Sequence, residues 1–129
     1  MRVKIKKIGK HTYPDVVLTC GKEFFEDDYV DTLLNPIGII EILSASTEAY
    51  DRGKKFQHYQ FIDSLAEYIM IVQDTVRVEQ YVRQSDHTWL YSEYQSLDDV
   101  VKLESVNCEM TLKDLHAKVP AITTPAPEN

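Results

Sequence analysis

Two strongly apolar segments, joined by a segment with helical spacing, constrain the fold of this chain more than any other feature. Residues 37–43 read IGIIEIL, and residues 67–73 read EYIMIVQ. Apolar residues on both faces of a strand are typical of a central strand that is covered on both sides. Because a helix between two such strands is the connection that parallel neighbours need, we expect the two segments to pair in parallel.

The connecting segment predicts a helix over residues 48–61. Its spacing defines one stripe and a shoulder beside it. The stripe holds Ala49, Gly53, Phe56 and Gln60. The shoulder holds Glu48, Arg52, Lys55 and Tyr59.

The rest of the chain is rich in short strands. Residues 2–8 alternate basic and apolar side chains, and residues 77–84 and 88–95 alternate around a compact turn, which predicts a hairpin. We expect an α/β (α+β) fold with a mixed sheet, a central crossover helix and a C-terminal antiparallel hairpin region. The domain is expected over residues 1–118, followed by a disordered proline-rich tail over residues 119–129.

Charge and composition limit the classes of partner. The 129 residues include 14 Lys+Arg and 21 Asp+Glu, for a net charge of −7, which counts against strong nonspecific DNA binding. No segment approaches the roughly 20 apolar residues of a membrane span, and the N-terminus lacks the apolar region of a secretory signal. We therefore expect a cytoplasmic protein without a membrane partner.

The charge is distributed unevenly along the chain. Residues 1–10 carry five basic groups and no acid, whereas residues 22–51 carry eight acids and one lysine. The basic run is compatible with phosphate contacts and with a solubilising face of an edge strand. Both alternatives remain open on the sequence.

Two carboxylates stand out beside the apolar strands. Glu41 lies inside the apolar segment 37–43, where a charge is costly unless it is paired or bound to a metal. Asp15 lies near the start of the segment YPDVV, directly after Pro14, and if the two strands pair, the carboxylates converge and could hold Mg²⁺. Lys55 is then the best candidate to orient a water and offset charge on a phosphate. The structural alternatives are a strand-start turn for Asp15 and an ion pair of Glu41 with Arg52 or Lys55.

The chain resembles a known family in the segments YPDVVLTC, PIGIIEILSASTEAYDRGKKFQHY and SLAEYIMIVQD. These are similar to the Uma-type restriction endonuclease family of the PD-(D/E)XK superfamily, and the similarity runs from about Arg2 to Leu115. The resemblance implies a restriction-endonuclease-like fold and Mg²⁺- or Mn²⁺-dependent hydrolysis of nucleic-acid phosphodiesters, with DNA as the expected substrate. It assigns Asp15 and Glu41 as metal ligands, with the main-chain carbonyl of Ile42 as a further ligand.

The sequence departs from the superfamily pattern at one catalytic position. The pattern places a lysine two residues after the second acid, where this chain has Leu43. The resemblance implies that Lys55, on the following helix, takes over this role, with Lys54 as the neighbouring alternative. Tyr59 and Gln73 fall at positions typical of the family and are possible accessory residues.

A second departure concerns the N-terminus and the expected assembly. Family members usually begin with a helix before a strand like MRVKI, and this chain begins at that strand, so we expect an N-terminally truncated relative. A homodimer would cover the face left open. The competing hypothesis is a catalytically degenerate nuclease-fold module that acts in oligomerisation or partner binding, which Leu43 and the net charge of −7 favour.

Overall fold

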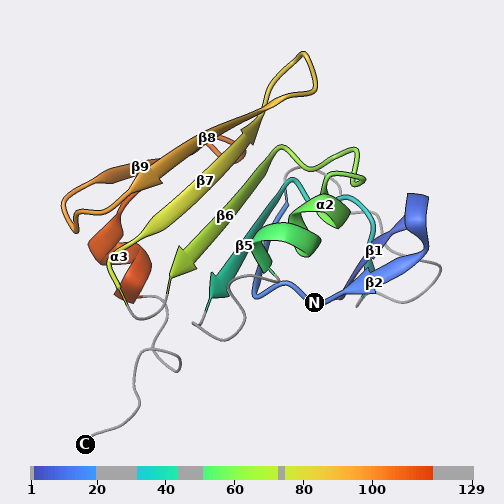
Figure 1. Cartoon of the computed structure of the whole chain (residues 1–129), viewed down its shortest axis with the longest axis horizontal. Helices are drawn as coiled ribbons and strands as arrows, with labels where there is room; N and C mark the ends of the chain where they lie inside the picture. Colours follow the sequence, from blue (N-terminus) through green and yellow to red (C-terminus); the bar gives the residue numbers. More distant parts are fainter. Residues whose placement is uncertain (1, 20–31, 44–50, 73–74, 118–129) are drawn as a thin grey trace, which may run out of the picture.

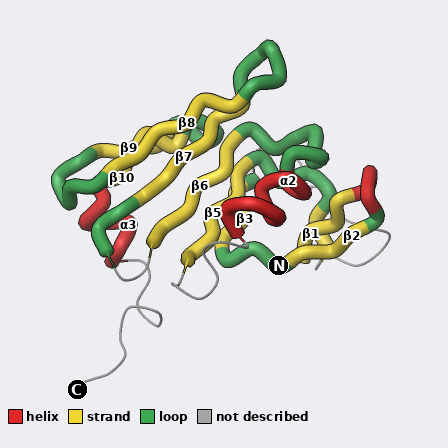
Figure 2. Tube along the Cα trace, viewed as in Figure 1, coloured by secondary structure: helices red, strands yellow, loops and turns green. Residues whose placement is uncertain are grey.

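The computed structural model describes residues 2–19, 32–43, 51–72 and 75–117. These residues form three β-sheets and a few short helices (Figures 1 and 2). The mixed α+β architecture is the fold class expected from the sequence. No helix in the described part of the chain has the length and apolar character needed to cross a bilayer.

The central sheet has five strands in the order β3-β5-β6-β7-β8. Its strands are β3 (Val16–Leu18), β5 (Gly38–Leu43), β6 (Glu67–Val72), β7 (Val78–Arg83) and β8 (Trp89–Tyr94). Strands β5 and β6 pair in parallel, and the other neighbours pair antiparallel. The predicted parallel pairing is therefore confirmed, and β7 and β8 form the predicted hairpin.

A smaller sheet lies beside the N-terminal end of the chain, in the order β2-β1-β4. It consists of β1 (Arg2–Ile5), β2 (Lys10–Thr12) and β4 (Thr32–Leu33). The strand predicted over residues 2–8 is shorter, because a 3₁₀ turn, η1 (Lys6–Ile8), follows Ile5. Gly9 then adopts a left-handed conformation with φ of 60°, which glycine allows at little cost, and the chain reverses into β2.

The helical connection between β5 and β6 consists of a π-helical segment, η2 (Asp51–Lys55), and α2 (Phe56–Tyr59). It ends earlier than the predicted residue 61, and residues 48–50 lie outside the described residues. Gly53 and Gln60, on the predicted stripe, are exposed, whereas Tyr59, on the predicted shoulder, is buried. The helix thus turns Tyr59 of the shoulder and Phe56 of the stripe toward the sheet.

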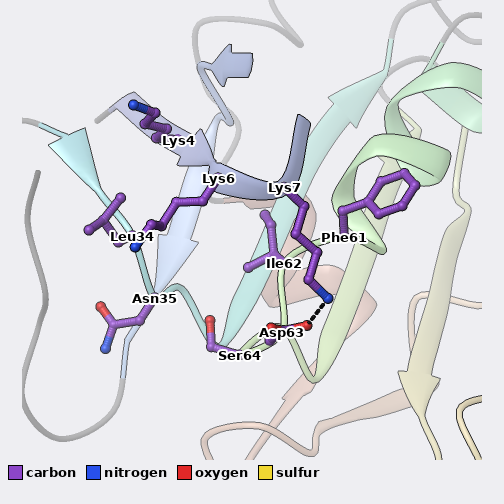
Figure 3. Close-up of a pocket in the computed structure, with 9 residues that line it drawn as sticks. All are labelled: Lys4, Lys6, Lys7, Leu34, Asn35, Phe61, Ile62, Asp63 and Ser64. Atoms are coloured by element: carbon purple, nitrogen blue, oxygen red, sulfur yellow. Dashed lines mark hydrogen bonds and ion pairs between the residues drawn. The ribbon is translucent and has the colours of Figure 1, made fainter. Parts of the chain in front are cut away.

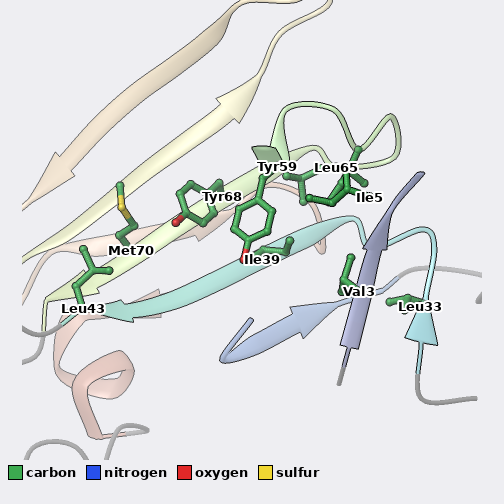
Figure 4. Packing of buried hydrophobic residues seen from close by; sticks show 10 residues of the cluster. Val3, Ile5, Leu33, Ile39, Leu43, Tyr59, Leu65, Tyr68 and Met70 are labelled. Atoms are coloured by element: carbon green, nitrogen blue, oxygen red, sulfur yellow. The ribbon is translucent and has the colours of Figure 1, made fainter. Parts of the chain in front are cut away.

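Aromatic packing holds this helix on one face of the central sheet. The Phe56 ring stacks on Tyr68 at 5.3 Å between centroids and contacts Tyr81 at 4.3 Å and Trp89 at 5.2 Å. The Arg83 guanidinium lies over Trp89 and donates to the carbonyl of Gln60 at the end of α2. The buried side chains between this helix, the small sheet and the central sheet form one hydrophobic cluster (Figure 4).

The opposite face of the central sheet carries a second layer. It comprises β9 (Val100–Leu103), β10 (Cys108–Thr111) and α3 (Leu112–Ala117), packed on a separate apolar cluster. Much of the acidic stretch over residues 22–51, namely residues 22–31 and 44–50, lies outside the described residues. Gln73 and the expected tail over residues 119–129 lie outside them as well.

Candidate metal and catalytic site

The register of β3 and β5 places Asp15 next to Glu41. Val16 pairs with Ile40 at the end of the antiparallel ladder, so the next position along sets Asp15 opposite Glu41. At this end of the ladder, the Asp15 side chain pairs with β5 in place of a strand carbonyl. Its Oδ2 accepts a hydrogen bond of 2.8 Å from the amide of Ile42. The backbone of Ile42 therefore borders the two carboxylates.

Glu41 is a buried acid with few hydrogen-bond donors around it. It is 2% exposed, its Oε2 accepts a hydrogen bond of 2.6 Å from the Tyr59 hydroxyl, and its Oε1 lies 3.5 Å from the Lys55 amine. Burial raises the pKa of Glu41 to about 7, the Tyr59 hydrogen bond and the charge of Lys55 oppose this rise, and Asp15 adds to it. A carboxyl that exchanges its proton near neutral pH is typical of functional sites.

A second hydroxyl supports Tyr59. The Oγ1 of Thr12, at the end of β2, lies 2.9 Å from the Tyr59 hydroxyl. Because Tyr59 donates its proton to Glu41, Thr12 must donate to the Tyr59 oxygen, which gives a chain of hydrogen bonds from Thr12 through Tyr59 to Glu41. Nothing in the sequence signals Thr12. The signals for Tyr59 are its spacing of four residues from Lys55 and its position in the family-like segment.

The three candidate positions for the catalytic lysine differ in burial and in distance from Glu41. Lys55 is half-buried and reaches Glu41, whereas Lys54 is exposed on the neighbouring side of the helix. Leu43, at the position where the superfamily has lysine, is fully buried in the hydrophobic cluster. The structure thus gathers Asp15, Glu41, Ile42, Lys55 and Tyr59, and leaves Lys54 outside the group.

The donor set fits a hard divalent cation. Asp15 and Glu41 supply carboxylate oxygens, and the adjacent main chain supplies carbonyl oxygen, which are the ligands that Mg²⁺ and Mn²⁺ prefer. The described residues contain no group of three or more His, Cys, Asp or Glu side chains placed to hold a metal. One or two carboxylates completed by water and substrate oxygens are nevertheless usual for Mg²⁺.

A solved structure shares this fold. The chain is similar to the crystal structure of a "putative nuclease belonging to DUF820" from Anabaena variabilis, with a TM-score of 0.69, 20% identity, and coverage of 90% of this chain and 64% of that one. At this identity the similarity shows the fold, and it confirms the predicted nuclease-like architecture.

Sequence comparisons identify the family. Two proteins of Synechocystis are similar to the chain: slr1290, 32% identical over 82% of this chain and 54% of its own length, and sll1609, 37% identical over 72% and 52%. The chain thus spans about half the length of these curated relatives. Residues 1–114 match the family described as "Uma2: Putative restriction endonuclease". The chain therefore belongs to the Uma2 family.

Proposed function

We propose that this protein is a Mg²⁺-dependent endonuclease that hydrolyses nucleic-acid phosphodiester bonds, with DNA as the expected substrate. The observation that carries the proposal is Glu41, a buried carboxyl with a pKa of about 7 beside Asp15 and the Lys55 amine. Such an arrangement is costly for folding and useful for binding a cation. Membership of the Uma2 family supports this class of activity.

In this proposal Asp15, Glu41 and the main-chain carbonyl of Ile42 hold the metal. A bound Mg²⁺ or Mn²⁺ would supply positive charge for the phosphate oxygens and lower the pKa of a bound water. Asp15 is already fixed by the amide of Ile42, and Glu41 by the hydroxyl of Tyr59. Both carboxylates are therefore oriented before any ligand arrives, which reduces the cost of binding.

Lys55 supplies the positive charge of the site. Its amine lies at hydrogen-bonding distance from Glu41 and is partly open to solvent, with 25% of its side chain exposed. We propose that it orients the attacking water and offsets negative charge that develops on the phosphate. Tyr59 and Thr12 are positioning residues, since they act through Glu41.

A cleavage assay tests the proposal. Labelled DNA and RNA, single- and double-stranded, are incubated with the purified protein and Mg²⁺ or Mn²⁺, beside the variants Glu41→Gln and Lys55→Ala. We expect each variant to lose cleavage by at least about 100-fold. Lys102→Ala, on β9 beyond the opposite face of the sheet, is the control and should match the wild type. Unchanged cleavage by Glu41→Gln would refute the assignment.

Metal binding separates this function from its alternative, a catalytically degenerate module that acts in oligomerisation or partner binding. The buried Leu43 is the observation that favours the alternative. Calorimetry with Mn²⁺ should show binding that Asp15→Asn and Glu41→Gln abolish. A folded wild type that binds no metal and cleaves no nucleic acid would instead support the alternative. Light scattering of the same sample tests the homodimer expected from the sequence.

A further inference from the structure

The connecting helix presents two adjacent rows of side chains. Lys55 and Tyr59 are four residues apart and both contact Glu41, so this row faces the carboxylates. Lys54 and His58 are likewise four residues apart and lie one position earlier, which places them on the neighbouring side of the helix. Lys54 is exposed and His58 is half-exposed, so this second row faces solvent beside the site.

Strand β2 brings a second lysine to this second row. The side chain of Thr12 contacts Tyr59, and Lys10 lies two residues earlier on the same strand. Because alternate strand residues share a face, Lys10 extends toward the helix beside Thr12. An independent sign of proximity is that, after burial, the positive charges of Lys10 and Lys54 lower the pKa of His58.

A hollow of about 220 Å³ near the turn η1 is a different feature. Three lysines line it, but the Lys7 amine is turned toward Asp63 and pairs with its carboxylate at 2.7 Å (Figure 3).

The surface around Lys10 combines basic groups from the strand and the helix. The described segment from Arg2 to Thr12 contains no acid that would offset them.

We propose that Lys10, Lys54 and His58 form a surface that binds the phosphate backbone of a nucleic acid next to the cleaved bond. The inference rests on the proposed function, because it takes the cleaved phosphate to lie at Glu41 and Lys55. Lys54 adjoins Lys55 on the side of the helix that faces solvent. In the proposed complex, the phosphate next to the cleaved one on the same strand passes this surface. The surface makes the site selective for polynucleotides over isolated phosphodiesters, since only a polynucleotide carries neighbouring phosphates.

Binding measured without metal tests the surface separately from catalysis. A fluorescent duplex and its single strand are titrated with the protein in EDTA, with salt varied from about 50 to 200 mM, and binding is followed by anisotropy. The double variant Lys10→Glu/Lys54→Glu should bind at least about 10-fold more weakly. Its salt dependence should be shallower, because the variant neutralises fewer phosphates. The log–log slope should fall by about 0.9 for each duplex phosphate that is no longer neutralised, and by about 0.7 for each single-strand phosphate.

The matched control is Lys102→Glu/Lys113→Glu, which makes the same charge change on β9 and α3 with two exposed lysines. Binding by the control should stay close to that of the wild type. Equal losses of affinity in both double variants, or an unchanged salt slope in Lys10→Glu/Lys54→Glu, would overturn the proposed surface. If the double variant does not fold, the single variants Lys10→Ala and Lys54→Ala replace it. Each should reduce the slope by the value for about one phosphate.

The experiments distinguish an error in the proposed surface from an error in the proposed function. A wild type that binds the oligonucleotides through Lys10 and Lys54, but cleaves none of them with Mg²⁺ or Mn²⁺, supports the surface and contradicts the nuclease activity. A wild type that cleaves, beside a double variant that binds as tightly as the wild type, supports the activity and contradicts the surface.

Discussion

Two buried glutamates on neighbouring parallel strands show how differently this protein treats a buried charge. Glu67, on β6, is fully buried and accepts four hydrogen bonds: from the Gln80 side chain, from the amides of Glu104 and Ser105, and from the Ser105 hydroxyl. It thereby ties the turn between β9 and β10 to the central sheet.

Glu41, on β5, faces the opposite side of the sheet and accepts one short hydrogen bond, from Tyr59, with the Lys55 amine 3.5 Å away. Burying a carboxylate is costly unless donors replace water. Glu67 has those donors and works as a structural residue. Glu41 has fewer, and its pKa of about 7 is the consequence. Glu67 therefore stabilises the fold, whereas Glu41 is the acid that we propose binds the metal.

The largest expected effect is the loss of stability on changing the structural acid. Glu67→Gln replaces one accepting oxygen with a donor and removes the charge, so we expect the free energy of unfolding to fall by about 3 kcal/mol. Urea unfolding at neutral pH, followed by circular dichroism, measures it. Glu41→Gln is the matched control and should be at least as stable as the wild type. A greater loss in Glu41→Gln than in Glu67→Gln would reverse the roles assigned to the two acids.

The second effect is a pH dependence of stability that belongs to Glu41. Its pKa is about 7 in the folded protein against an ordinary 4.5, so between these values the folded state holds a proton that the unfolded state has lost. This stabilising contribution is complete below pH 4.5 and disappears as the pH rises through about 7. Without metal, the free energy of unfolding of Glu41→Gln should therefore rise relative to that of the wild type as the pH increases, by at most about 3 kcal/mol. Parallel stability curves for the two proteins would contradict the raised pKa.

A third test removes the hydroxyl between Thr12 and Glu41. In Tyr59→Phe the hydrogen bond that lowers the pKa of Glu41 is lost, so this pKa should rise further above its ordinary value. We expect a loss of about 1–2 kcal/mol in stability, because two buried polar groups lose their common partner. Carbon-13 NMR titration of the glutamate carboxyls measures the pKa. An unchanged Glu41 titration would show that Tyr59 does not act on this acid.

The smallest effect is expected at the start of the hydrogen-bond chain. Thr12→Val keeps the shape of the side chain and removes the donor to Tyr59, at a cost of about 1 kcal/mol. The Glu41 titration should move slightly and in the same direction as in Tyr59→Phe. Thr32→Val, which removes a partner of Arg2 in the same small sheet, should leave this titration unchanged. Equal shifts in the two threonine variants would argue against a specific chain.

Much of the fold follows from local patterns in the sequence. The apolar segments around Ile39 and Ile69 predict buried strands, and the helix between them predicts their parallel pairing, because few connections allow that geometry. A charge within such a segment singles out Glu41. The residue-level roles of Asp15, Glu41 and Lys55 stay predictions, although the structure places these side chains together.

Other parts of the site depend on how elements pack rather than on local sequence. The helical spacing groups Gly53, Phe56 and Gln60 on one stripe, but only Phe56 of the three packs on the sheet. Lys55 and Tyr59 of the shoulder face Glu41 instead. Thr12 joins the site only because the small sheet packs against this helix, and a single threonine gives no signal of that packing.

The hydrogen bond between Asp15 and the amide of Ile42 gives the protein a built-in reporter. At the end of the β3–β5 ladder, this amide proton is held by a side-chain carboxylate instead of a strand carbonyl. Its rate of exchange with deuterium therefore depends on the position of one ionisable group and not only on the stability of the sheet. Any ligand that draws the Asp15 carboxylate away should speed the exchange of this proton, while the amides within the β5–β6 pairing keep their protection.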